Sequence, residues 1–119
     1  MTKALLLIDH GSKVEAANTM LLELVTSLRV VKPGTIIEAA HMELAQPTIA
    51  QGFDACVQKG ATHVVAIPYM LSPGRHATTD IPRLVQQAAK QHLGIQVTVT
   101  DCLGLHPKLM DIILEKAAL

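Results

Sequence analysis

Four short apolar runs, each followed by a stretch with helical periodicity, constrain the fold of this chain more than any other feature. The first run, residues 4–8, is apolar at every position and stops at Asp9. A run of this kind is typical of a strand that is buried on both faces, as strands of parallel sheets are. From Ser12 to about Val31, apolar residues recur every three or four positions. This spacing predicts a helix with Ser12 as its N-cap, stopped by Pro33.

The same alternation continues to the end of the chain. Three further runs with strand character are each followed by a helical pattern: residues 35–44, 63–71 and 95–100. Pro47 and Pro107 are placed to start two of these helices, because proline fits the first helical turn, and another helix is expected from about Thr79. Strand-helix units joined by right-handed crossovers give a parallel sheet with helices on both faces. The sequence therefore predicts one three-layer α/β/α domain with a four-stranded parallel sheet over residues 1–119.

Charge and length exclude several classes of protein. The chain has 119 residues, with ten basic and ten acidic side chains and no net charge, which argues against nucleic acid or a membrane surface as a partner. No apolar run approaches the roughly 20 residues of a membrane helix, and the N-terminus lacks the pattern of a signal peptide. We expect a cytoplasmic protein whose partners are small molecules or copies of itself. Cys56 and Cys102 form no CxxC pair and are expected to be reduced and packed as small hydrophobic residues.

Side chains that bind metals or accept protons follow the ends of the predicted strands. His10 follows the first strand, Glu43 lies at the end of the second, and His76 lies in the loop after the third. Because ligands of open α/β sheets bind at the carboxyl ends of the strands, we expect these three residues to share one rim. Two imidazoles and a carboxylate suit a borderline divalent ion, and three ligands leave coordination positions open. The sequence thus predicts a metal site formed by His10, Glu43 and His76.

Other polar residues leave alternatives open. His41 is expected to face the same side of the sheet as Glu43, either as a fourth ligand or as a buried strand histidine. His106 is either part of the rim or a polar residue at the entry to the last helix. Ser12 beside His10 would suit a hydrolase, but no GxSxG motif accompanies the pair. Motifs for nucleotide phosphates are also missing, which disfavours nucleotide binding.

Four segments at the strand ends carry a family resemblance: LLLIDHGSK, HMELAQPTI, VVAIPYMLSPGRHATTDIP and LGLHP. In this order and spacing they resemble the small sirohydrochlorin chelatases, which are class II, ferrochelatase-like chelatases of cobalamin and siroheme biosynthesis. The resemblance runs over roughly residues 3–116. It implies half of the ferrochelatase-like fold, a homodimer, and insertion of Co²⁺, Fe²⁺ or Ni²⁺ into sirohydrochlorin. The metal is then a substrate, and no prosthetic group is expected. A carrier that binds the same metal or tetrapyrrole without turnover is the alternative.

The resemblance also implies roles for individual residues. His10 and His76 would bind the metal and accept the pyrrole protons, and Glu43 would complete the metal site. Sirohydrochlorin is rich in carboxylates, for which Arg75 is the first candidate because its guanidinium binds a carboxylate through two hydrogen bonds. Lys13 is a second candidate.

Further substrate contacts are expected along the first strand end and the loop after the third strand. Backbone N–H groups near Ser12 would add hydrogen-bond donors. Contacts to the ring would come from Tyr69, Met70 and Leu71, and Gly74 would let the backbone turn toward the histidine that follows. The chain departs from the family pattern in its PYML segment, where Pro-Leu-Phe-Leu is more usual, and it lacks a histidine-rich tail.

Overall fold

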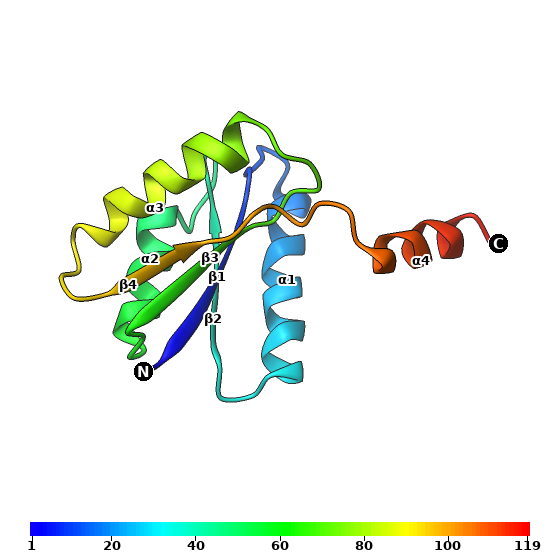
Figure 1. Cartoon of the computed structure of the whole chain (residues 1–119). Coiled ribbons are helices and arrows are strands. Elements are labelled where there is room, and N and C mark those ends of the chain that lie inside the picture. The colour runs from blue at the N-terminus through cyan, green and yellow to red at the C-terminus, as the bar shows by residue number, and fades with distance from the viewer.

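The computed structural model describes residues 1–119 as a parallel sheet with helices on both faces (Figure 1). The strands are β1 (Lys3–Asp9), β2 (Ile36–His41), β3 (His63–Pro68) and β4 (Gln96–Val99). The helices are α1 (Glu15–Val31), α2 (Ile49–Gln58), α3 (Ile81–Ala89) and α4 (Pro107–Lys116), with a π-helical turn η1 (His76–Asp80) before α3. All neighbouring strands pair in parallel, in the order β2-β1-β3-β4. This confirms the predicted four-stranded α/β/α architecture.

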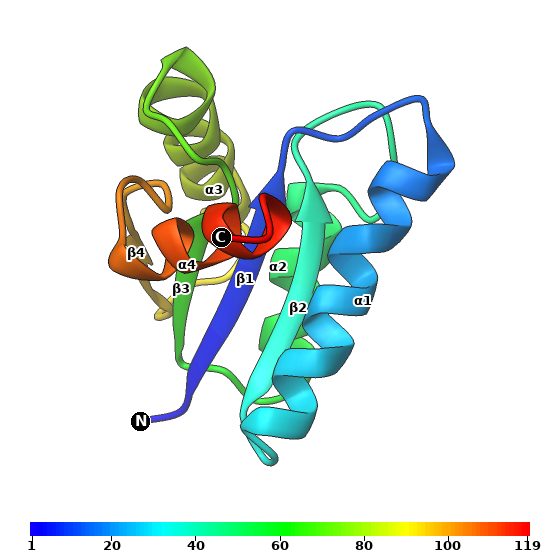
Figure 2. The same cartoon turned by 90° about the vertical axis from the view of Figure 1, so that its right-hand side faces the viewer.

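The two faces of the sheet are covered unequally. The larger core lies between the sheet and helices α2 and α3, and it includes Leu6, Phe53 and Val85, which are fully buried. The smaller core lies under α1, where Leu21 and Val25 pack against strands β1 and β2. Figure 2 shows α1 on its side of the sheet, running beside β2 at the sheet edge. None of the helices has the length and apolar character that crossing a membrane requires.

Two helices begin later than the sequence predicts. Ser12 is not the N-cap of α1. The helix starts at Glu15, and the Ser12 hydroxyl accepts a hydrogen bond from the N–H of Val14 at 2.9 Å. Helix α2 starts after Pro47, because Thr48 and Gln51 form a capping box that satisfies the first free N–H groups of the helix.

Helix α4 stands away from the sheet. It begins at Pro107 as predicted, and the Nδ1 atom of His106 accepts a hydrogen bond from the N–H of Lys108 at 3.1 Å. Of the two roles considered for His106, the structure therefore shows the helix cap. No residue of α4 is buried, and Figure 1 shows the helix projecting beyond α1. The last helix covers neither face of its own sheet.

Cys56 on α2 is fully buried, whereas Cys102 is partly exposed, and both are free thiols. Burial raises the pKa of the Cys56 thiol from its usual 9.0 to about 12, and the nearby Glu38 carboxylate acts in the same direction. Because only a thiolate attacks a disulfide reagent, we expect Ellman's reagent at pH 8 to label one thiol per folded chain and two per unfolded chain. The Cys102→Ser variant should then show no labelling until it unfolds. Labelling of the folded variant would contradict the burial of Cys56.

Candidate metal centre

The strand order places a crevice at the carboxyl ends of β1 and β3. From β1 the chain moves to β2 on one side, and it then returns across the sheet to β3 on the other side. The helices that follow β1 and β3 therefore lie on opposite faces, and their connecting loops diverge above the sheet. His10 directly follows β1, and the loop after β3 leads into η1 at His76.

His10, Glu43 and His76 meet at this crevice. The imidazole rings of His10 and His76 lie edge to face with their centroids 4.6 Å apart. The Nε2 atom of His10 lies 3.4 Å from Oε1 of Glu43, and these two side chains are 45% and 51% exposed. The structure thus brings together the three residues that the sequence indicates as metal ligands, at a site that is open to solvent.

The three side chains are neighbours, but their nitrogen and oxygen atoms do not point to one common position. No group of three or more His, Cys, Asp or Glu side chains in the chain has the arrangement of a metal site. Imidazole nitrogens bind a divalent ion at about 2.0–2.1 Å, so the rings of His10 and His76 must turn from their edge-to-face contact to share one. The histidines and Glu43 are placed for an ion that enters from the open side, while the ligand geometry itself is not formed in this structure.

Hydrogen bonds at Nδ1 leave the other ring nitrogen of each histidine free. Nδ1 of His10 lies 3.1 Å from the carbonyl oxygen of Gly11, and Nδ1 of His76 lies 3.0 Å from Oδ2 of Asp80. Both oxygens accept, so both Nδ1 atoms donate, and Nε2 is left with its lone pair. Nε2 of His10 then faces the Glu43 carboxylate. A lone pair and a carboxylate that face each other at this distance are able to share a cation.

Sequence reasoning did not assign the partner of His76. Asp80 lies one helical turn after this histidine, and its carboxylate holds the Nδ1 proton. The His-x-x-x-Asp spacing was the signal in the sequence, because residues four apart on a helix are neighbours.

His41 lies beneath the site. Its side chain is fully buried, and its Nδ1 atom lies 2.6 Å from Oδ1 of Asp9. Its Nε2 atom has no hydrogen-bond partner. β2 ends at His41, so the alternation of side chains on which the expectation for His41 and Glu43 was based does not extend to Glu43. Of the two roles considered, the structure shows a buried strand histidine.

Gly11 allows the loops after β1 and β2 to touch. Its φ angle is +88°, and a Cβ atom built there would lie 1.8 Å from the carbonyl oxygen of Glu43. The same two loops are joined by a hydrogen bond from the N–H of Glu43 to the carbonyl oxygen of His10 at 3.2 Å. The side-chain amide of Asn18, a second residue that sequence reasoning missed, fixes the loop further by bonding both the N–H and the C=O of Ser12. Ser12 is therefore part of the scaffold of this loop.

Two of the three residues predicted to contact a tetrapyrrole ring line a hollow next to His10. Tyr69 and Met70 form one side of this hollow of about 280 Å³, and the segment after β1 forms the other. Leu71 lies outside it and is largely exposed. A shallow, partly apolar hollow beside an imidazole is suited to a planar ligand edge.

The two cations predicted to bind carboxylates have no partner in the chain, and the turn at Gly74 differs from its prediction. Arg75 and Lys13 are exposed and form no salt bridge, so their charges are available to a ligand. Gly74 has no positive φ, and a Cβ atom would have open space around it, so the turn does not require glycine. Its carbonyl oxygen instead accepts hydrogen bonds from the backbone and the hydroxyl of Thr78.

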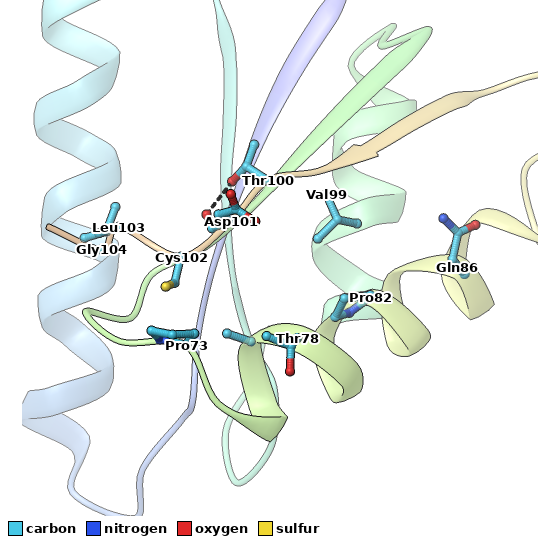
Figure 3. Close-up of a pocket in the computed structure, with 11 residues that line it drawn as sticks. Pro73, Thr78, Pro82, Gln86, Val99, Thr100, Asp101, Cys102, Leu103 and Gly104 are labelled. Carbon is cyan, nitrogen blue, oxygen red and sulfur yellow. Dashed lines mark hydrogen bonds between the residues drawn. The ribbon is translucent and has the colours of Figure 1, made fainter.

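A larger hollow of about 690 Å³ lies between the segment around η1 and α3 and the segment after β4 (Figure 3). One wall is formed by the loop and helix around Pro73, Thr78 and Pro82, and the other by the segment 99–104 after β4. His10, Glu43 and His76 are not among the residues that line this hollow. The polar groups that it presents include the Thr100 hydroxyl and the Asp101 carboxylate.

An open α/β sheet with two imidazoles and a carboxylate at its switch point belongs to the class of α/β proteins that bind their ligands at the carboxyl ends of the strands. Comparison with known proteins identifies the family. The family model of CbiX matches residues 4–118, so the chain belongs to the CbiX family.

Individual relatives agree with this assignment. The chain is 44% identical over 112 residues to the chloroplastic sirohydrochlorin ferrochelatase of Arabidopsis thaliana, with 94% of this chain and 50% of the relative covered. It is 32% identical over 90 residues to the sirohydrochlorin cobaltochelatase of Methanocaldococcus jannaschii, with 76% and 63% covered. The crystal structure of the sirohydrochlorin chelatase SirB from Bacillus subtilis subspecies spizizenii, in complex with cobalt, matches with a TM-score of 0.92 at 29% identity. That match covers 99% of this chain and 50% of the SirB chain, so the fold is half of the SirB structure.

Proposed function

We propose that this chain inserts a divalent metal ion into sirohydrochlorin, with Co²⁺ or Fe²⁺ as the metal and Ni²⁺ as a further possible substrate. The observation that carries the proposal is the convergence of His10, Glu43 and His76 at the switch point of a CbiX-family sheet. The chain spans half the length of the Arabidopsis relative. The proposed activity is therefore based on the residues of this chain. The choice of sirohydrochlorin as the substrate is supported by the relatives, which are sirohydrochlorin chelatases.

Metal insertion requires groups that hold the ion, offset its charge and accept the pyrrole protons, and the site has a candidate for each. Nε2 of His10 and of His76 would hold the ion, and the Glu43 carboxylate would offset its charge. As the ion enters the ring, two pyrrole N–H protons leave, and the imidazoles released from the metal accept them, with Glu43 able to take one onward. The metal and two protons thus exchange places, and charge is conserved. Asp80 keeps His76 in the tautomer that has its lone pair at Nε2.

The weakness of this ligand set is part of the proposal. Thiolates are absent from the site, and each of the side chains that line it contacts solvent. A site with two neutral imidazoles and one carboxylate binds a borderline ion and also releases it, whereas a closed cysteine site would retain it. Such a site is suited to the transfer of an ion.

The proposal extends to the substrate contacts and the setting of the reaction. Arg75 and Lys13 would bind carboxylates of sirohydrochlorin, and the ring would lie against Tyr69, Met70 and Leu71. Asn18 bonds the backbone of Ser12, so the Ser12 hydroxyl, which is able to donate, would replace the expected backbone contact, and the Gly74 N–H would add a second hydrogen bond at the rim. Residues 1–119 would act as a single chelatase domain that pairs as a homodimer in the cytoplasm. The chloroplast location belongs to the Arabidopsis relative.

Turnover separates this proposal from a carrier that only binds the metal or the tetrapyrrole. We expect the visible spectrum of excess sirohydrochlorin with Co²⁺ to shift to that of the metallated product, in an amount many times that of the protein. A time course of absorption with and without protein measures this rate above the spontaneous reaction. A spectral change that stops at one equivalent per site would instead identify a carrier.

A further inference from the structure

His41 is a buried imidazole that the proposed metal site does not use. Its side chain is fully buried, and its Nδ1 atom donates a hydrogen bond to Oδ1 of Asp9 at 2.6 Å. Its Nε2 atom has no hydrogen-bond partner. A buried polar atom without a partner destabilises the folded state, and an aliphatic side chain of similar size would avoid this cost. The presence of an imidazole here is therefore explained by its other nitrogen, which holds Asp9.

The Asp9–His41 pair lies at the carboxyl ends of the two strands that lead to His10 and Glu43. Asp9 and His41 are register partners in β1 and β2, which run side by side in Figure 2. The preceding register pair on the same face consists of two core residues under α1, Leu7 and Ala39. The Asp9–His41 pair continues this row of contacts toward the strand ends, with a hydrogen bond in place of an apolar contact.

Each member of the pair is connected through the backbone to a predicted metal ligand. Asp9 directly precedes His10, and His41 precedes Glu43 by two residues. The N–H of Met42 donates to the carbonyl oxygen of Asp9 at 2.9 Å. The N–H of Glu43 donates to the carbonyl oxygen of His10 at 3.2 Å. A change in the spacing of Asp9 and His41 would therefore be transmitted to both ligands.

The two ligands have few side-chain contacts that could set their distance. The side chains of His10 and Glu43 are 45% and 51% exposed. The hydrogen bond at Nδ1 of His10 goes to the adjacent residue, Gly11, so it does not restrain the distance to Glu43. A Cβ atom at Gly11 would lie 3.2 Å from Cβ of His41, which places His41 directly beneath this loop. The backbone and the buried pair under it therefore determine where the ligands stand.

We propose that the hydrogen bond between His41 and Asp9 positions the metal site by fixing the distance between His10 and Glu43. The inference rests on the metal site of the proposed function and adds two positioning residues to it. Both act through the backbone that leads to the ligands, and neither is a ligand. Loss of the hydrogen bond would let the two strand ends separate, and ligands that stand further apart bind an ion less tightly.

Two substitutions at position 41 separate the hydrogen bond from the packing. His41→Leu fills most of the same space and removes the donor, and water reaches the Asp9 side chain, which is 19% exposed. The melting temperature should stay close to that of the unmodified chain, while Co²⁺ binding weakens by about tenfold. His41→Asn places a side-chain N–H where Nδ1 lies, but it leaves a cavity. It should bind Co²⁺ within about twofold of the unmodified chain and melt at a lower temperature.

Isothermal titration with Co²⁺ alone and thermal unfolding measure the two effects. The variants are expected in opposite orders for metal affinity and for stability, which a purely structural role of His41 would not produce. The matched control is His63, which is also buried and bonds Thr98 of the neighbouring strand at 2.8 Å, but lies at the amino end of β3. His63→Leu should leave Co²⁺ binding unchanged. Metal affinity that follows the melting temperature in all variants would overturn the proposal.

Substitutions of Asp9 distinguish the hydrogen bond from the charge. Asp9→Asn keeps an oxygen that accepts from Nδ1 of His41, so Co²⁺ binding should stay within about twofold, whereas Asp9→Leu should weaken it by about tenfold. Equal losses in the two variants would show that the carboxylate charge acts on the ion directly. That result would contradict a positioning role.

Nuclear magnetic resonance of the His10 ring tests the same coupling without a metal. The C–H signals of His10 should shift in His41→Leu and stay in place in His41→Asn. This pattern in a chain that binds no Co²⁺ would remove the proposed metal site and leave His41 as the residue that positions His10. Metal insertion by the unmodified chain, together with equal Co²⁺ affinity in His41→Leu, would leave the proposed function and overturn this inference.

Discussion

Replacing His76 with alanine is expected to lower the rate of cobalt insertion into sirohydrochlorin by at least about a hundredfold, because a positioned acid-base group typically contributes 10²–10⁴ to a rate. The imidazole lies 4.6 Å from that of His10 between ring centroids, and its Nε2 atom is the one left free by Asp80. Its loss removes both a metal ligand and a proton acceptor. The side chain is 47% exposed, so the folded state should be almost unaffected. Initial rates of absorption change measure the effect.

A matched control removes an imidazole outside the site. His92 follows α3, stacks on Phe53 and lies 3.5 Å from Asp54 of α2, away from the carboxyl ends of the strands. The His92→Ala variant should therefore insert metal at close to the original rate. If His76→Ala retained the original rate while circular dichroism showed both variants folded, His76 would not be a ligand or a base. The same experiment with His10→Ala tests the other imidazole.

Replacing Gly11 with alanine is expected to destabilise the protein by about 2–5 kcal/mol and to abolish metal insertion. A φ angle of +88° costs a residue with a Cβ atom about 1–2 kcal/mol. The new methyl group would also lie 1.8 Å from the Glu43 carbonyl oxygen, and such overpacking adds about 1–3 kcal/mol. The loops that carry His10 and Glu43 would have to separate. Urea unfolding measures the stability, and the absorption assay measures the activity.

Gly34 provides the control for the part of the destabilisation that comes from the positive φ angle alone. Its φ angle is +84°, but nothing lies within 4 Å of the position a Cβ atom would take. The Gly34→Ala variant should therefore lose only about 1–2 kcal/mol and keep its activity. Equal losses in the two variants would show that the contact between Gly11 and Glu43 does not hold the site together.

The sequence alone was sufficient for the sheet and for the three residues at its rim. Continuous apolar runs such as residues 4–8 specify buried parallel strands, and polar residues at their ends are forced toward one edge because parallel strands all end there. His10, Glu43 and His76 were therefore predictable as neighbours. The starts of α1 and α2 were less predictable. Helix α1 begins without a side-chain cap, and α2 begins after Thr48 because this residue forms a capping box with Gln51.

Only the tertiary structure decided what surrounds these three residues. The close approach of Gly11 to Glu43 joins the loops after two different strands, and the buried contact of His41 with Asp9 joins β2 to β1. The exposure of α4 also has no sequence signal, because its apolar pattern is the same whether it packs on its own sheet or on another. Periodicity specifies that a helix has an apolar side, and contacts between segments distant in the sequence determine what covers it.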